Sequence, residues 1–182
     1  NEVFDGRLDD IGIITQGGMF NAVMRSLAEL GLADHFGRTD VPIYVLNVTY
    51  PLVSAEITQF CAGKRAVLVV EEGHPDYIEQ AIHVILRKAD LNTRVIGKDV
   101  LPMAGEYTME TMIAGLAKFI EGSVPHGVDH GDVARRADAI AGIRIKAAEL
   151  LGAPIPVRPP GFCTGCPERP VFTAIKLIEK EV

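Results

Sequence analysis

The stretch Ile11-Gly12-Ile13-Ile14-Thr15-Gln16-Gly17-Gly18 decides how the first part of this 182-residue chain folds. Its opening residues form an almost uninterrupted apolar run of strand length, and the two glycines at its end suit a tight turn. Met19–Leu30 follows with apolar residues spaced three and four apart, and Gly31 is a typical helix stop. A buried strand that leads directly into an amphipathic helix indicates a strand–helix unit of a parallel sheet.

The same alternation of strand and helix continues to about residue 100. Further buried strands are expected at Ile43–Val48, Ala66–Val70 and Thr93–Ile96. Amphipathic helices are expected at residues 54–62, with Ser54 as the N-cap, and at residues 76–88, with Pro75 as an early helical position. Apolar strands joined through helices predict an α/β fold, a three-layer αβα domain with a mostly parallel sheet over residues 8–100.

The remainder of the chain has no strand pattern. Two more helices are expected, at residues 108–121 and 131–151. We therefore expect residues 101–151 to form a helical appendage. Four prolines within Ala153–Pro160 then predict an extended, stiff linker, because proline lacks a backbone donor and disfavours helix in the residue before it. A final helix over residues 168–180 has no core of its own, so residues 152–182 are expected to be a linker and the first elements of a further domain.

Composition excludes some classes of partner. The net charge is −6 and no stretch concentrates Lys and Arg, which argues against a nucleic-acid surface. No run approaches the ~20 apolar residues that cross a bilayer, so a membrane is not an expected partner. The opening Asn1-Glu2-Val3 has no Met and no leader-like pattern, which predicts a cytoplasmic protein and is typical of a piece of a longer chain or an engineered segment.

Two polar segments at strand ends are candidate sites, and each also has a structural interpretation. Gln16-Gly17-Gly18 lies between a strand and a helix, where anions and cofactors bind, although a tight turn needs the same small residues. Glu71-Glu72-Gly73-His74-Pro75 follows another strand and could supply acid–base groups, begin a helix or contact another domain. Because adjacent strand residues point to opposite faces, Glu71 and Glu72 are poorly placed as a catalytic pair.

A third segment has the spacing of metal ligands. His126 and His130 lie four residues apart with Asp129 between them. Gly127 and Gly131 disfavour the helix that this spacing would require, so an exposed loop is the expected structure.

The sharpest feature of the chain is the pair of thiols in Cys163-Thr164-Gly165-Cys166. Metal and iron–sulfur sites normally take four ligands, and only two lie close together here, since Cys61 falls in an apolar helical pattern. We interpret Cys163 and Cys166 as half of a metal-ligand set or as a structural element of a cofactor domain. A self-contained CxxC module that binds metal or exchanges thiols is the alternative, and a purely structural interaction domain is a third.

The segment from Arg158 to Lys176, RPPGFCTGCPERPVFTAIK, resembles the RPPxxCxGCPHRxxxxAIK segment of indolepyruvate:ferredoxin oxidoreductase alpha subunits. In that family the segment opens the domain that holds thiamine pyrophosphate. Thr49-Tyr50-Pro51-Leu52 and Val67–Gly73 resemble parts of the transketolase C-terminal-like domain that lies between the two thiamine domains of the family, and Ile11–Gly18 resembles its opening strand and turn. The resemblance identifies the chain as an internal fragment of such a subunit, with the sheet as its transketolase C-terminal-like domain.

This resemblance implies an enzyme that oxidatively decarboxylates aryl 2-oxoacids such as indolepyruvate to acyl-CoA, with ferredoxin as the electron acceptor. It implies thiamine pyrophosphate, Mg²⁺ and 4Fe–4S clusters as cofactors of the full-length enzyme. The implied partners are the remaining domains of the same chain, a beta subunit or fused equivalent, ferredoxin, CoA and the 2-oxoacid, in a homo-oligomer.

The resemblance assigns no catalytic residue to this fragment. By their position at the start of the thiamine domain, it implies cofactor-binding roles for Cys163, Gly165, Cys166, Glu168 and Arg169. Cys163 and Cys166 would ligate a metal only as part of a larger set. The family usually has His where this chain has Glu168, and the family's GDG…N motif for magnesium diphosphate does not occur. We therefore expect the fragment alone to be a scaffold that neither binds thiamine pyrophosphate tightly nor turns over substrate.

Overall fold

The structure is a computed structural model that describes residues 1–73, 75–153, 166 and 168–180. The chain divides into two compact units, Asn1–Arg144 and Ile145–Val182, which are described separately. The first unit contains the sheet and its covering helices.

Five strands form one sheet in the order β1-β3-β2-β4-β5. Their bounds are Glu2–Phe4 for β1, Ile11–Gln16 for β2, Ile43–Leu46 for β3, Ala66–Val70 for β4 and Arg94–Ile96 for β5. β2 pairs in parallel with both β3 and β4, and β4 pairs in parallel with β5. The sequence pattern did not predict β1, which pairs antiparallel with β3 at the edge of the sheet. The mostly parallel sheet that the apolar runs predict is thus confirmed.

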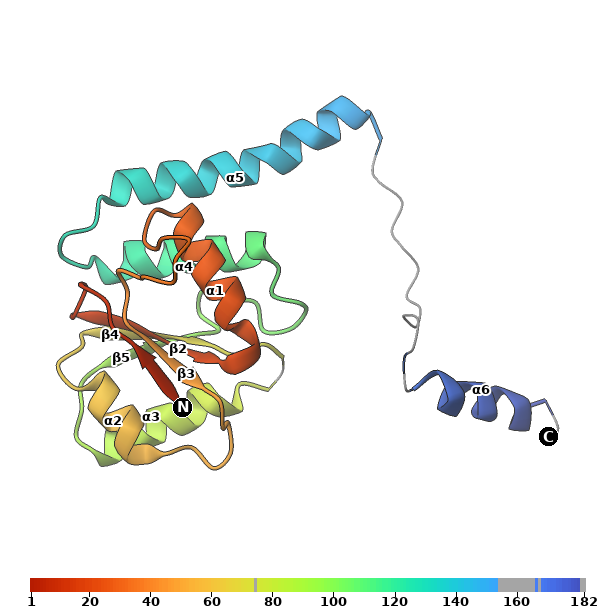
Figure 1. Cartoon of the computed structure of the whole chain (residues 1–182), viewed down its shortest axis with the longest axis horizontal. Helices are drawn as coiled ribbons and strands as arrows, with labels where there is room; N and C mark the ends of the chain where they lie inside the picture. The colour runs from red at the N-terminus through yellow and green to blue at the C-terminus, as the bar shows by residue number, and fades with distance from the viewer. Residues whose placement is uncertain (74, 154–165, 167, 181–182) are drawn as a thin grey trace. The chain divides into compact units, whose positions relative to one another are not determined.

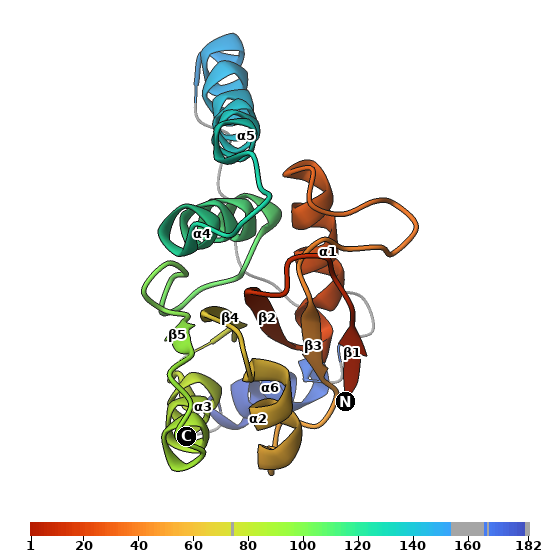
Figure 2. The same ribbon diagram turned by 90° about the vertical axis from the view of Figure 1, so that its left-hand side faces the viewer.

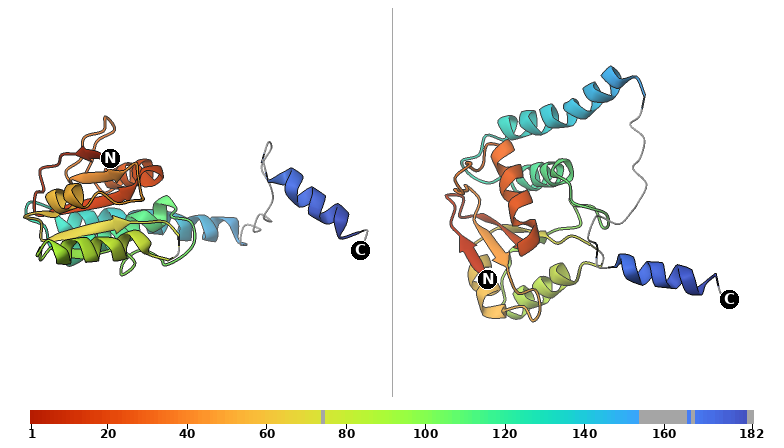
Figure 3. Two further views of the ribbon diagram at one scale, coloured as in Figure 1. Left: turned by 90° about the horizontal axis from the view of Figure 1, so that it is seen from below. Right: turned by 45° about the vertical axis from the view of Figure 1, so that its right-hand side comes forward.

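Two helices cover each face of the sheet (Figure 1, Figure 2). α1 (Phe20–Glu29) and α4 (Met109–Ser123) lie together on one face, and α2 (Ser54–Cys61) and α3 (Tyr77–Lys88) lie on the other. The right panel of Figure 3 shows the same three layers from a further direction. This arrangement confirms the predicted αβα fold.

The two faces of the sheet follow from strict alternation along the buried strands. In β2, Ile11 and Ile13 belong to the core beneath α1 and α4, whereas Ile14 belongs to the core above α2 and α3. Every residue of β4 is buried, as expected of a central strand covered on both sides. Full burial of such a side chain stabilises the fold by about 1.5–3 kcal/mol, so these two strands anchor the unit.

Helix α4 belongs to the sheet domain and not to an appendage. Met112, Leu116 and Phe119 are fully buried in the same core as Leu27 of α1. Gly115 allows this close packing, because a Cβ at that position would meet the side chain of Leu101. The expected division after residue 100 is therefore wrong as a packing boundary. The sequence pattern identified the helix, but α1 alone leaves part of its face of the sheet uncovered, and α4 fills that space.

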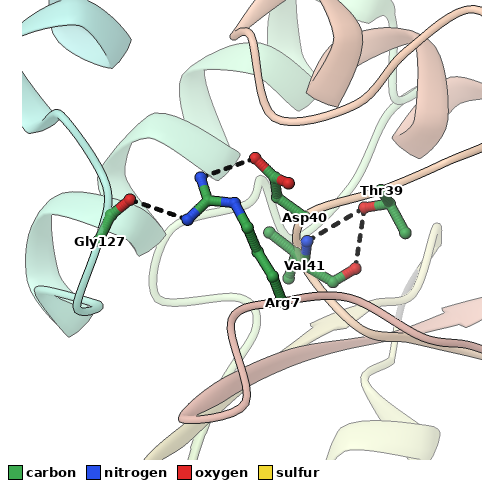
Figure 4. A network of polar contacts seen from close by, with 5 residues as sticks. All are labelled: Arg7, Thr39, Asp40, Val41 and Gly127. Carbon is green, nitrogen blue, oxygen red and sulfur yellow. Dashed lines mark hydrogen bonds and ion pairs between the residues drawn. The ribbon is translucent and has the colours of Figure 1, made fainter.

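Two arginines fasten the end of α4 to the loops that precede the parallel strands. Arg7 donates from Nη1 to the Gly127 carbonyl at 3.0 Å and from Nη2 to Asp40 at 2.9 Å (Figure 4). Arg65 donates from Nη2 to Asp10 at 2.8 Å and to the Val124 carbonyl at 2.7 Å. We call this end of the sheet the amino edge. The loop after α4 is thus tied to it from two directions.

Two expected helix starts differ from the observed ones. Ser54 is the first residue of α2 and not its N-cap, which is Val53. α3 begins at Tyr77 after Asp76 as N-cap, so Pro75 lies before the helix and not within it. In both cases the side chain of the N-cap residue makes no capping hydrogen bond.

The second unit contains the end of α5 (His130–Leu151), which begins in the first unit, and α6 (Arg169–Ile178). All of the described residues of α6 are exposed, including its apolar side chains. Residues 154–165, where the proline-rich linker is expected, lie outside the described residues.

Candidate functional site

The candidate site lies at the end of the sheet opposite the amino edge, where the parallel strands finish. We call this end the carboxyl edge. The connection after β2 crosses one face of the sheet through α1, and the connection after β4 crosses the other face through α3. The ends of β2 and β4 therefore flank the topological switch point, which is where open α/β sheets place their ligands. Gln16 and Glu71, which both belong to segments singled out from the sequence, lie there.

A cavity of about 540 Å³ opens at this point between the strand ends and α3. Its wall is largely apolar and aromatic, and we call it the carboxyl-edge pocket. Its lining residues include Gln16, Tyr50, Leu52, Glu71, Tyr77 and Ala81. The loop after β3 and the first turns of α3 contribute most of them, because both begin at this edge.

Glu71 caps helix α3 from outside the helix. Both of its carboxylate oxygens accept from the Ile78 amide at 3.0 Å, and Oε2 also accepts from the Glu79 amide at 3.1 Å. The residue is only 5% exposed. The first amides of a helix have no partner within it, and a negative charge there is favourable, so Glu71 satisfies both needs. Its carboxylate occupies the position where an anionic ligand would bind a helix N-terminus.

Glu72 has a different environment from its neighbour. Its backbone amide donates to Oε1 of Gln16 at 2.9 Å, and its own Oε1 accepts from the Tyr107 amide at 2.6 Å. The two glutamates therefore hold different elements and do not act as a pair, as the alternation of strand residues predicts. Glu71 thus contributes to the start of a helix, as one interpretation of this segment expects, and the acid–base interpretation stays a prediction. His74 lies outside the described residues.

Lys98 connects the loop after β5 to the same edge. Its Nζ donates to the carbonyls of Glu71 and Gly73, the latter at 2.9 Å, and to the Tyr107 hydroxyl at 2.7 Å. The Tyr107 hydroxyl in turn donates to the Pro102 carbonyl at 2.6 Å. Desolvation lowers the pKa of Lys98, and the Glu71 carboxylate opposes that shift. Burial raises the pKa of Tyr107 to about 12.

Glu79 completes the polar cluster from inside α3. Its side chain is buried, and Oε2 accepts from the Lys98 amide at 3.0 Å. Gly97 provides the space for this contact, because a Cβ there would collide with the Glu79 carboxylate. A charge this buried is tolerated only when it is hydrogen-bonded.

Sequence reasoning missed Glu79, Lys98 and Tyr107. Glu79 had a signal, since it falls beside Ile78 and Ile82 on the apolar face of its helix. Lys98 and Tyr107 had none, because they reach the cluster only through tertiary contacts. Together the cluster binds loops to one another and leaves no free carboxylate pair for proton transfer.

The other segments singled out from the sequence are structural where they are described. Gly17 and Gly18 begin a short 3-10 turn into α1, which agrees with the tight-turn interpretation. Oδ1 of Asp129 accepts from the Asp132 amide at the start of α5. Asp132 pairs with Arg135 and Arg136, and the bond from Arg136 lowers the pKa of its carboxyl most. Within the part of the chain that the structure describes, no cluster of His, Cys, Asp and Glu could hold a metal.

The cysteine motif is only partly described. Cys163 and Gly165 lie outside the described residues, so their expected roles stay predictions. Cys166 is half-buried, Glu168 is the N-cap position of α6, and Arg169 is the first residue of that helix. Cys61 is buried as expected, and desolvation raises the pKa of its thiol to about 12, so it is a poor thiolate.

The chain is similar to known proteins, and the family match covers the strands of the sheet. The profile of the family described as indolepyruvate ferredoxin oxidoreductase middle domain matches residues 1–111. Indolepyruvate oxidoreductase subunit IorA of Methanothermobacter thermautotrophicus is 29% identical over 100% of this chain, and that of Methanothermobacter marburgensis is 31% identical over 95%. The chain spans only about a quarter of the length of these relatives, 25% and 24%.

Among solved structures, 2-oxoglutarate:ferredoxin oxidoreductase from Magnetococcus marinus is similar at 23% identity, with a TM-score of 0.44 over 65% of this chain and 19% of that one.

No helix among the residues that the structure describes is long and apolar enough to span a bilayer.

Proposed function

Since the chain belongs to the family of indolepyruvate ferredoxin oxidoreductase middle domains, we propose that it is the central part of a longer oxidoreductase polypeptide. That enzyme oxidatively decarboxylates aryl 2-oxoacids such as indolepyruvate to acyl-CoA and passes the electrons to ferredoxin. The family match over residues 1–111 carries the proposal, and the resemblance of the segment from Arg158 to Lys176 to the opening of a thiamine domain supports it.

Within that enzyme, we assign the chain the role of a scaffold between catalytic domains. At the carboxyl edge, where an active site would be expected, Glu71, Glu72 and Glu79 all accept hydrogen bonds from backbone amides. These three carboxylates, among the described residues of the edge, thus serve to hold loops and a helix. The catalytic residues then belong to other parts of the polypeptide or to a partner subunit.

The described residues do not fit thiamine diphosphate. The N-terminus of α3 is occupied by the Glu71 carboxylate, and none of the described residues that line the carboxyl-edge pocket is a cation. We therefore propose that thiamine pyrophosphate with Mg²⁺, and the 4Fe–4S clusters, are held elsewhere in the enzyme, which works in the cytoplasm as a homo-oligomer. Cys163, Gly165, Cys166, Glu168 and Arg169 would contribute only to the start of the thiamine domain, with Cys163 and Cys166 as part of any larger ligand set.

The intact mass of the natural polypeptide tests the first part of this proposal. We expect a mass several times the 19.7 kDa of this chain. Calorimetry then tests the scaffold role, with thiamine pyrophosphate and Mg²⁺ titrated into the 182-residue chain and into the longer polypeptide. Binding is expected for the longer polypeptide alone, and tight binding to the 182-residue chain would refute the scaffold role.

Metal content and thiol titration separate this proposal from a self-contained CxxC module. A stoichiometric metal in the 182-residue chain, or a thiol count that rises by two on reduction, would favour such a module at Cys163 and Cys166.

A further inference from the structure

We propose that the carboxyl-edge pocket receives an apolar side chain from another domain of the same longer polypeptide. The inference rests on the proposed function and adds to it the surface through which this domain contacts its neighbour. Four observations support the proposal: the apolar lining of the pocket, the exposed apolar residues beside it, the hydrogen bonds of the adjacent loops, and the greater length of the relatives.

The chemistry of the pocket excludes anionic ligands. Tyr50, Leu52, Tyr77 and Ala81 provide most of its wall, and Glu71 is the charged residue among the described ones that line it. None of these described lining residues is a Lys, Arg or His that could balance a carboxylate or a diphosphate. Both Glu71 oxygens accept from amides of α3, so this carboxylate is held at the start of the helix. An uncharged, apolar group is the ligand that such a wall binds best.

Exposed apolar residues gather around this pocket. Beside the lining residues Tyr50 and Tyr77, the loop between β3 and α2 carries two more exposed apolar residues, Val48 and Val53. Tyr50 is 90% exposed and Tyr77 is 69% exposed, although both line the cavity. A cluster of apolar side chains around a cavity marks an interaction site, and tyrosine is enriched among the residues that dominate binding energy.

Hydrogen bonds hold the β4 and β5 loops at the carboxyl edge. Glu71 fixes the start of α3. Glu72, in the β4 loop, binds Gln16 and the Tyr107 amide. Lys98, in the β5 loop, donates to the Gly73 carbonyl of the β4 loop and to the Tyr107 hydroxyl. Binding to a preformed surface loses little conformational entropy. The polar cluster therefore preorganises the β4 and β5 loops and the start of α3, and the apolar side chains of the wall take no part in these bonds.

The size of the surface points to a partner in the same polypeptide. The chain spans about a quarter of its relatives, 25% in one case, and its family is defined as a middle domain, so it has covalently joined neighbours. A stable contact between separate chains needs about 20–30 residues on each side. A covalent neighbour is present at an effective concentration in the millimolar range, so a pocket with a few exposed side chains suffices.

Site-specific photocrosslinking in the longer polypeptide tests the proposal. Tyr50→p-benzoyl-L-phenylalanine places the photoreactive group at the pocket, and the same replacement of Val84, which is 53% exposed on α3, is the control. We expect position 50 to crosslink within one polypeptide to a peptide outside residues 1–182, at a yield several times that of position 84. A crosslink between two copies, or none beyond the background of position 84, would overturn the proposal.

A charge placed in the pocket gives an independent test. Ala81→Arg puts a guanidinium in the pocket wall, whereas Val84→Arg puts one on the exposed side of the same helix. In the longer polypeptide we expect Ala81→Arg to lower the Tm by about 4 °C more than Val84→Arg, while the two variants of the 182-residue chain differ by less than about 2 °C. Equal shifts in both polypeptides would reject the interdomain contact. The intact-mass measurement decides the proposed function separately.

Discussion

The two edges of the sheet hold their loops by different means. At the amino edge, Arg7 and Arg65 each bind one carboxylate and one carbonyl, and the side chain of Arg7 is 55% exposed while that of Arg65 is 48% exposed. At the carboxyl edge, Glu71 and Glu79 are buried and accept from backbone amides.

This difference indicates which edge contributes more to the stability of the domain. Exposed ion pairs contribute about 0–1 kcal/mol each and are weakened by salt. Removal of a buried acceptor instead leaves an amide without a partner, which costs about 1–3 kcal/mol for each group. The carboxyl edge should therefore be more sensitive to substitution than the amino edge.

Glu71→Ala should have the largest effect. It leaves the Ile78 and Glu79 amides unpaired at the start of α3, and we expect the free energy of unfolding to fall by about 2–4 kcal/mol. Urea denaturation of the 182-residue chain measures it. Glu71→Gln keeps one acceptor oxygen and should lose about half as much. A smaller loss in the free energy of unfolding than that caused by Arg7→Ala would contradict the expected order of the two edges.

Gly97→Ala should follow, because the added methyl group collides with the buried Glu79 carboxylate and breaks its bond from the Lys98 amide. Overpacking of this kind costs about 1–3 kcal/mol. Gly122→Ala is the matched control, since that glycine lies in α4 with open space around it, and alanine there should stabilise by about 0.5–1 kcal/mol. Opposite signs in the two denaturation curves are the expected result.

Tyr107→Phe should change how stability depends on alkaline pH. The native pKa of Tyr107 is raised from 10.0 to about 12, so the native state holds this proton more tightly than the unfolded state. Its contribution is complete below pH 10 and is lost as the pH rises toward 12, by no more than about 2–3 kcal/mol. The variant should therefore lose less stability than wild type between pH 10 and 12.

Tyr50→Phe, which removes the hydroxyl of an exposed tyrosine, is the matched control variant for that measurement. Burial also raises the pKa of Tyr44, so part of the slope should remain in Tyr107→Phe. An unchanged slope in the variant would show that Tyr107 is not the responsible group.

The contrast between the edges also shows what the sequence could and could not predict. Apolar runs predicted β2 and β4 to within about a residue, because a strand buried on both faces has few alternatives. β1 is only Glu2–Phe4, too short for a periodic signal, and its place depends on pairing with β3. Local pattern thus identified the four parallel strands and not β1, the antiparallel strand at one edge.

At the candidate site, local pattern indicated the position but not the partners. A helix start was one of the interpretations of the segment at Glu71, but it was expected at Pro75, whereas the residue that caps α3 is Glu71, seven positions before its amide partner Ile78. Lys98 and Tyr107 reach the site from the loop after β5. Such contacts depend on how loops cross the edge, which neither periodicity nor residue type determines.

Val124→Gly should stabilise the amino edge. Val124 ends α4 in the left-handed region, with a φ of 44°, which a β-branched residue adopts only under strain. Since 57% of the residue is exposed, little apolar burial is lost. We expect the free energy of unfolding to rise by about 1 kcal/mol. Val124→Ala retains most of the strain and should change stability by less than half as much, which thermal unfolding can resolve.

Arg7→Ala should have the smallest effect, about 0.5 kcal/mol, because the side chain is exposed and water replaces its bonds to Asp40 and Gly127. Its dependence on salt sharpens the comparison. In 1 M NaCl the difference between Arg7→Ala and wild type should shrink toward zero, whereas the loss in Glu71→Ala should persist, since buried hydrogen bonds are screened far less than exposed charges. Urea denaturation at low and high salt measures both. If the two losses shrink together, the carboxyl edge is held by charge attraction and not by satisfied amides.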